Sequence, residues 1–405
     1  EHIKEYLQPR FFKSKRGHRN APYDNLKPAE IENLLVRAMK QTDRYRGMKK
    51  AGYSDAAIRD TFNVKYPMRV FAYTGSRDTI MSPMDSIRYY KHFLRVGFMS
   101  MDPITGYVKA YVGGPDYTHF QYDMAMVGRR QVGSTIKPYL YTLAMENGFS
   151  PCDQTRNVEQ TILTEDGQIW IPRNTGNKDD YAKIVTLRWG LSQSNNWISA
   201  YLMSKLNPYA FKSLIHQFGI RNQDIQPTPS LCLGPCDISV GEMVGAYTAF
   251  PNNGIRTEPL FVTRIEDNEG NIIATFTPKT YEVISKESSY KMVDMMKAVV
   301  DEGTGRRLRF RYNLKAEIAG KTGTTNDNAD GWFIGFTPEL VTGVWVGWED
   351  RTVHFTNMAD GQGASMALPV WGNYMYNVYN DTTIGYDKTR GFDIPEWFNP
   401  NAGCN

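Results

Sequence analysis

Hydrophobic positions recur at helical spacing through the first part of the chain. Between Ile31 and Met39 apolar residues return every three or four positions, which is typical of one buried helix face, and Pro28 suits the first turn of that helix. Ser54 is placed to cap a second helix that continues through Phe62. Further elements predicted here are a strand over Val70–Tyr73 and a helix over Ile87–Leu94 that begins near Asp85 or Ser86. We therefore expect residues 1–95 to form a small helical linker or pedestal region.

Beyond residue 95, helix patterns dominate the middle of the chain and strand patterns dominate its later part. The runs Phe98–Met101 and Tyr107–Val112 flank a turn-rich stretch and predict a hairpin. Helices are predicted over Ser134–Glu146, Leu187–Leu202, Leu233–Phe250, Tyr290–Val300 and Leu368–Tyr379, and strands over Ile318–Thr325, Gly331–Phe336 and Val341–Trp348. Residues 150–182 are polar and irregular. This order indicates an α+β layered fold over residues 96–380, followed by a tail over 381–405.

Composition permits one large domain and a smaller one. The chain has 405 residues, of which 41% are hydrophobic, and its net charge is +4. So mild a basic excess does not indicate a nucleic-acid partner. No apolar stretch approaches the roughly 20 residues that span a bilayer. Because the first residues read as the middle of a helix, we expect an excised fragment of a longer, anchored protein.

The cysteines and histidines do not form a metal-binding pattern. Cys152, Cys232, Cys236 and Cys404 include no Cys-x-x-Cys pair, and the six histidines are scattered. We therefore expect no metal and no cofactor. A disulfide among Cys152, Cys232 and Cys236 and buried free thiols are both compatible with the spacing.

Three short motifs follow one another in a fixed order. They are Ser134-Thr135-Ile136-Lys137, Ser194-Asn195-Asn196 and Lys321-Thr322-Gly323-Thr324. Ser-x-x-Lys alone is a weak signal, and the chain holds a second copy that starts at Ser288. There Ser288 or Ser289 is expected to cap a helix. Ser-x-Asn and Lys-Thr-Gly each occur once, and only the Ser134 copy precedes both.

The first motif can supply a nucleophile together with its base. A serine hydroxyl needs a base within hydrogen-bond reach to attack at neutral pH. Residues i and i+3 of a helix lie about 5–6 Å apart at Cβ, so Lys137 can reach Ser134. Lysine ordinarily titrates near ~10.4 and must be neutral to accept a proton. Burial and a second cation, for which Lys321 is the candidate, would both lower the Lys137 pKa.

The second motif is expected to transfer the proton taken from the nucleophile to the leaving group. Ser194 is placed to relay it to a leaving group, and Asn196 can hydrogen-bond a substrate amide and the Lys137 amine. The backbone N–H groups of Ser134 and Thr324 are candidates for an oxyanion hole.

The third motif is expected to bind the substrate. Lys321 would bind a substrate carboxylate and make the electrostatic potential of the site more positive. The hydroxyls of Thr322 and Thr324 would face the same carboxylate, and Gly323 would keep the groove free of a side chain. Together the motifs indicate a serine acyl-transfer site without histidine or metal.

The residues in and around these motifs resemble those of class A penicillin-binding proteins. Their motifs are similar to Arg130–Pro138, Ser192–Asn196 and Gly320–Thr325 of this chain, and to the flanking Met101–Gly106, Gly113-Gly114 and Asp330–Phe333. The resemblance covers about residues 96–375. It implies the penicillin-binding protein/serine β-lactamase-like fold, with an antiparallel sheet flanked by helices. Residues 1–95 look like the linker of such proteins from Bacteroidetes-like bacteria.

The resemblance also implies a function, partners and a location. Ser134 would attack the D-Ala-D-Ala end of a peptidoglycan stem peptide in the periplasm, and an amine on a second stem would take the acyl group. β-Lactam antibiotics would acylate Ser134. Family members usually carry a membrane anchor and an N-terminal glycosyltransferase domain, whose acidic motifs we do not find here.

Three other functions share parts of this pattern. A D,D-carboxypeptidase uses the same residues with water as the acceptor. A non-catalytic penicillin-binding sensor or scaffold is a binding function, against which the complete set of motif residues argues. A class A β-lactamase also needs a Glu-x-x-Leu-Asn segment, which is missing between Ser194 and Lys321.

Overall fold

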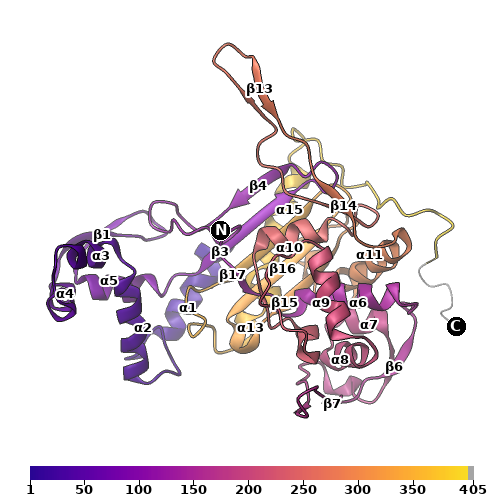
Figure 1. The fold of residues 1–405 in the computed structure, drawn as a ribbon, viewed down its shortest axis with the longest axis horizontal. Coiled ribbons are helices and arrows are strands. Elements are labelled where there is room, and N and C mark those ends of the chain that lie inside the picture. Colours follow the sequence, from indigo (N-terminus) through magenta and orange to yellow (C-terminus); the bar gives the residue numbers. More distant parts are fainter. Residues whose placement is uncertain (400–405) are drawn as a thin grey trace.

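The computed structural model describes residues 1–399, and its N-terminal region extends away from the main body (Figure 1). This region contains α2 (Pro28–Lys40), α3 (Asp43–Lys50), α4 (Asp55–Phe62), α5 (Pro83–Tyr90) and a hairpin of β1 (Tyr66–Val70) with β2 (Arg77–Met81). Pro28 is the first residue of α2, and the Ser54 side chain accepts from the Ala57 N–H, as predicted.

Two predictions for this region were wrong in position. The strand expected over Val70–Tyr73 lies earlier and ends at Val70. The third helix begins at Pro83, because the Ser82 hydroxyl caps it by accepting from the Asp85 N–H, and it ends at Tyr90. Before this region, α1 (Gln8–Lys15) packs on the main sheet. Phe11 shares a hydrophobic cluster with Val344 and Val346 of the sheet, and its ring lies 4.4 Å from that of Trp348 at a tilt of 41°.

A five-stranded antiparallel sheet forms the centre of the main body. Its strand order is β15-β16-β17-β3-β4. The strands are β3 (Arg95–Met101), β4 (Val108–Val112), β15 (Ala319–Thr324), β16 (Asp330–Phe336) and β17 (Val341–Gly347). The predicted hairpin and the three predicted later strands are therefore confirmed, and they join one sheet. The strand that carries Lys321 lies at its edge.

Helices cover both faces of this sheet. Along β16, Trp332, Ile334 and Phe336 enter one hydrophobic cluster and Phe333 enters the other. Alternate residues of a strand point to opposite faces, so continuous burial along β16 and β17 means that both faces are covered. The first cluster includes α6, α8, α9, α10 and α11, and the second includes α1 and α15. The α+β architecture is confirmed.

The helices of the main body agree with the predictions in part. The helices of the main body are α6 (Lys137–Glu146), α7 (Leu187–Ser192), α8 (Asn196–Lys205), α9 (Pro208–Gln217), α10 (Val240–Tyr247), α11 (Lys286–Asp301), α12 (Arg307–Phe310), α13 (Met358–Gly361), α14 (Gly363–Met366) and α15 (Leu368–Asn380). The helix predicted over Leu233–Phe250 is shorter. Ser285 caps α11, so the prediction of Ser288 or Ser289 as its cap was wrong.

Short strand pairs complete the fold. Residues 150–182 are mostly irregular, with β6 (Gln154–Arg156), β7 (Ile162–Leu163) and β8 (Ile169–Trp170), and β9 (Ile184–Thr186) follows. Elsewhere lie β5 (Arg130–Gln131), β10 (Asp237–Ile238), β11 (Ile255–Thr257), β12 (Arg264–Glu266), β13 (Ile272–Thr275) and β14 (Thr280–Glu282). The β12–β13 hairpin projects from the body (Figure 1). Among residues 1–399, no helix has the length and apolar character needed to cross a bilayer.

Candidate active site

Ser134 lies in a 3₁₀ turn that precedes α6. The turn is η2 (Gly133–Ile136), and α6 begins only at Lys137, so the expectation of an α-helix from Ser134 onward was wrong by one turn. Backbone hydrogen bonds fix this turn, with the Gly133 N–H donating to the Gly234 oxygen at 3.1 Å. Both glycines have positive φ, and a Cβ on Gly234 would meet the Gly133 oxygen at 2.1 Å.

The Lys137 amine is completely buried and is held by the second motif. Its Nζ donates to the Ser194 backbone oxygen and to Asn196 Oδ1, both at 2.7 Å, and lies 3.4 Å from Ser194 Oγ. Burial penalises the charged form of an amine, which lowers the pKa of Lys137 to about 7. A lysine in this state can accept a proton at neutral pH.

The second motif sits at a break between two helices. The sequence predicted one helix over Leu187–Leu202, but α7 ends at Ser192 and α8 begins at Asn196. Ser194 has a left-handed backbone with φ 54°, and the Asn195 side chain caps α8 by accepting two backbone N–H groups. This break turns Ser194 and Asn196 toward Lys137, a placement that a continuous helix would not give to both.

Lys321 reaches the same hydroxyl from the edge strand β15. Its Nζ donates to Ser194 Oγ at 2.8 Å and to the Thr322 oxygen at 2.9 Å. Burial first, and then the like charge of Lys137, lower the Lys321 pKa well below its ordinary value. Because two buried amines converge on one hydroxyl, we expect the pair to titrate as a unit and not to hold both protons at neutral pH.

The remaining residues of the third motif line the edge of β15. The Thr322 hydroxyl lies 2.6 Å from the Thr304 hydroxyl, and the Thr324 hydroxyl accepts from the Gly363 N–H at 2.9 Å. A Cβ on Gly323 would lie 2.8 Å from Thr135 Cγ2 and 2.8 Å from the Val132 oxygen. The glycine therefore permits close packing between β15 and the turn that carries Ser134.

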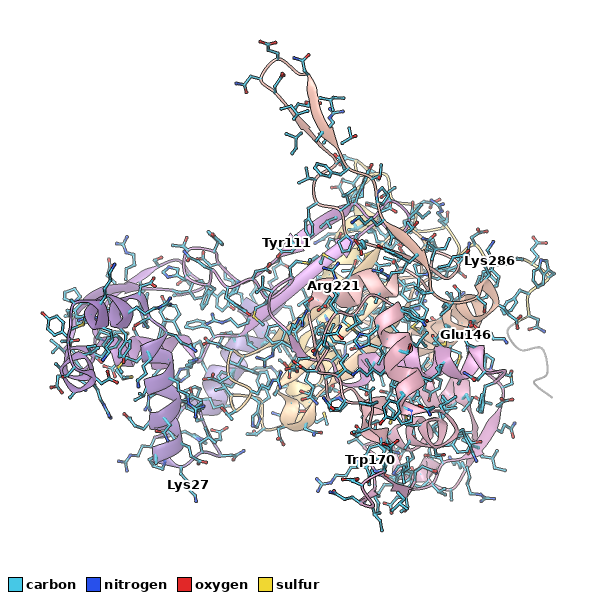
Figure 2. All side chains as sticks on the ribbon, in the orientation of Figure 1. Lys27, Tyr111, Glu146, Trp170, Arg221 and Lys286 are labelled. Atoms are coloured by element: carbon cyan, nitrogen blue, oxygen red, sulfur yellow. The ribbon has the colours of Figure 1, made fainter. Side chains whose placement is uncertain are left out.

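These elements enclose one cleft of about 1070 Å³. Of the predicted site residues it is lined by Ser134, Ser194, Asn196, Thr322 and Thr324, while Lys137 and Lys321 lie buried beneath. Sequence reasoning missed Thr304 and the segment Trp170–Gly176, which also contribute to its wall. Figure 2 shows Trp170 at the lower edge of the body, near the position of α8 in Figure 1.

The cysteines do not form the disulfide that the spacing allowed. Cys232 and Cys236 are buried free thiols, so no disulfide joins any two of Cys152, Cys232 and Cys236. The alternative expectation of buried thiols is correct for these two. Burial raises the pKa of both thiols to about 12, so neither is a thiolate nucleophile at neutral pH. Cys404 lies outside the described residues.

The Ser194 hydroxyl lies beside two buried amines next to the edge strand β15, and Ser134 lines the same cleft. These are the groups that the sequence predicted for a serine acyl-transfer site. Comparison with known families agrees with this class. Residues 96–348 match the penicillin binding protein transpeptidase domain, and residues 18–94 match the penicillin-binding protein middle domain. The chain belongs to the penicillin-binding protein transpeptidase family.

The chain is similar to penicillin-binding protein 1A from several bacteria. The chain is 36% identical over 283 residues to the protein of Aquifex aeolicus, which covers 70% of this chain and 38% of that protein. The Neisseria meningitidis protein is 32% identical over 289 residues, covering 70% and 35%. The crystal structure of penicillin-binding protein 1A from Haemophilus influenzae aligns with a TM-score of 0.68 at 25% identity, over 75% of this chain and 49% of that one. The aligned region is thus about a third of the curated relatives' length.

Proposed function

We propose that this chain acts as a serine D,D-transpeptidase that cross-links peptidoglycan stem peptides. The observation that carries the proposal is the hydrogen-bonded set of Lys137, Ser194, Asn196 and Lys321 beside Ser134 in one cleft. Membership of the transpeptidase family supports it. The division into residues 1–95, 96–380 and 381–405 is part of the proposal, supported by family matches that meet between residues 94 and 96.

In the acylation step, Ser134 Oγ attacks the carbonyl carbon of the penultimate D-Ala of a donor stem. Lys137 takes the hydroxyl proton, and the N–H groups of Ser134 and Thr324 stabilise the oxyanion, a contribution worth about 10²–10³ in rate per donor. Ser194 gives its hydroxyl proton to the leaving nitrogen and is reprotonated by Lys137, the C–N bond breaks and D-Ala departs. Lys321, Thr322 and Thr324 hold the terminal carboxylate during this step.

In the second step an amine replaces the serine. The amine of an acceptor stem attacks the ester carbon of the acyl-enzyme, loses its proton to Lys137 and forms the new amide. The bond from that carbon to Ser134 Oγ breaks, and Lys137 gives the proton that it took from the amine to this oxygen, which restores the serine hydroxyl. β-Lactam antibiotics would follow the first step only, because their ring-opened acyl group stays on Ser134.

The setting of the complete protein is also part of this proposal. We infer a longer protein with a glycosyltransferase domain, anchored in the inner membrane and acting in the periplasm, because the matched relatives are much longer than the aligned region. The proposed origin in a Bacteroidetes-like bacterium rests on residues 1–95 alone, since the two curated relatives above come from Aquifex and Neisseria.

Product analysis tests the reaction type. Incubation with a peptide ending in D-Ala-D-Ala and an amine acceptor is expected to release D-Ala and to give the donor–acceptor amide, both visible by mass spectrometry. Hydrolysed donor alone would favour a D,D-carboxypeptidase. Acylation by penicillin without any peptide turnover would favour a non-catalytic sensor, and either result would contradict the transpeptidase assignment.

A further inference from the structure

Two formally charged side chains line the cleft, Arg173 and Asp327. Arg173 follows β8 and Asp327 lies in the β15–β16 turn, and both residues are exposed. Within residues 1–399 the Arg173 guanidinium makes no ion pair or side-chain hydrogen bond, although 24 ion pairs form elsewhere. An arginine that faces a substrate cleft without a protein partner has its donors available to a ligand.

The backbone that carries Arg173 is fixed against the second motif. Asn196 Nδ2 donates to the Arg173 carbonyl oxygen at 2.7 Å, and the Asn196 N–H donates to Asn174 Oδ1 at 3.2 Å. One residue away, the Trp197 indole N–H donates to the Pro172 oxygen at 3.1 Å. Arg173 is therefore held directly beside the amide that is proposed to bind the donor peptide.

This position determines which part of the donor Arg173 would meet. The Asn196 amide nitrogen has two hydrogens, of which the Arg173 oxygen accepts one. The other is available for the donor amide on the N-terminal side of the penultimate D-Ala. With the terminal carboxylate at β15, as in the proposed function, the donor residue immediately before D-Ala-D-Ala would extend past Asn196 toward Arg173.

We propose that Arg173 is a specificity-determining residue that binds a free carboxylate on the donor residue preceding D-Ala-D-Ala. The inference rests on the proposed function and names the substrate class of the same site, a stem peptide with an acidic third-last residue. A guanidinium matches a carboxylate with two parallel hydrogen bonds, which gives both orientation and selectivity. Arg173 touches no reacting atom in this arrangement, so it affects donor binding and not acylation as such.

Two donor peptides and two variants test the assignment. The peptides differ only in the residue before D-Ala-D-Ala, which carries either a side-chain carboxylate or the matching carboxamide. For Arg173→Gln we expect kcat/KM for D-Ala release to fall about tenfold with the carboxylate peptide, mainly through KM, and to stay unchanged with the carboxamide peptide. Lys178→Gln is the matched control, because Lys178 is an exposed cation five positions along the same segment that does not line the cleft.

Acylation by penicillin separates this inference from the proposed function. We expect Arg173→Gln to form the penicillin adduct at the wild-type rate. An equal loss on both peptides, a parallel loss of penicillin acylation or an unchanged preference for the carboxylate would each overturn the role of Arg173. A wild type that forms the adduct but turns over neither peptide would instead overturn the proposed reaction, and the substrate assignment with it.

Discussion

The Ser134→Ala variant is expected to form no covalent adduct with penicillin, whereas the wild type gains the mass of one penicillin molecule. Ser134 lies in the turn η2, lines the cleft and stands three residues before the buried Lys137. Ser194 also lines the cleft, but its hydroxyl already accepts from Lys321 at 2.8 Å and lies next to the Lys137 amine. Intact-mass spectrometry after incubation measures the adduct without assuming which residue carries it.

Ser288→Ala provides a matched control for this experiment. Ser288 begins the second Ser-x-x-Lys copy, where Lys291 pairs with Glu287 at 2.7 Å on the surface of α11. That lysine is engaged with a carboxylate, and neither Ser288 nor Lys291 lines the cleft. We expect full labelling of this variant. An adduct on Ser134→Ala at the wild-type rate would show that another residue is the nucleophile.

Lys137→Ala is expected to slow acylation by penicillin about 10²–10⁴-fold, the range typical of losing a general base. Without this amine, the groups that remain around its position are the Asn196 amide, which is not a base, and Lys321, whose Nζ donates to Ser194 Oγ. The rate of adduct formation, followed by stopped-flow with a fluorescent penicillin, measures the effect.

A second lysine variant excludes a general effect of charge removal. Lys291→Ala removes the lysine of the other motif copy and is expected to leave acylation unchanged. Thermal unfolding of Lys137→Ala checks that the variant is folded, because the substitution leaves the Ser194 oxygen and Asn196 Oδ1 without this donor. Near-normal labelling of Lys137→Ala would take Lys137 out of its role as the base.

Local sequence patterns predicted most of the sheet and several helix bounds because those signals are local. The strands β16 and β17 are buried on both faces and appear in the sequence as mainly apolar runs between polar turns. Pro28 and Ser54 act within one helical turn of their own positions, so their roles could be predicted. Ser285 was missed because two other serines nearby fit the same capping pattern.

The shape of the site could be predicted only in part, because its contacts join distant segments. The order of the three motifs indicated which residues to consider. The break at Ser194 is invisible in the apolar pattern from Leu187 to Leu202, since that pattern continues on both sides of it; the one local hint is Asn195, a good N-cap residue. The Thr304–Thr322 contact and the position of Arg173 arise from tertiary packing alone.

The pH dependence of single-turnover acylation tests most directly whether a buried amine next to the nucleophile is kept neutral. The rate is limited by the fraction of Lys137 without a proton, so below the Lys137 pKa it should fall tenfold for each pH unit. We predict that the rate rises with pH and levels off above an apparent pKa of about 7, and that this rise is absent from Lys137→Ala. A wild-type rate that continues to rise toward the ordinary lysine pKa near ~10.4 would contradict the proposed base, as would a rise that persists unchanged in Lys137→Ala.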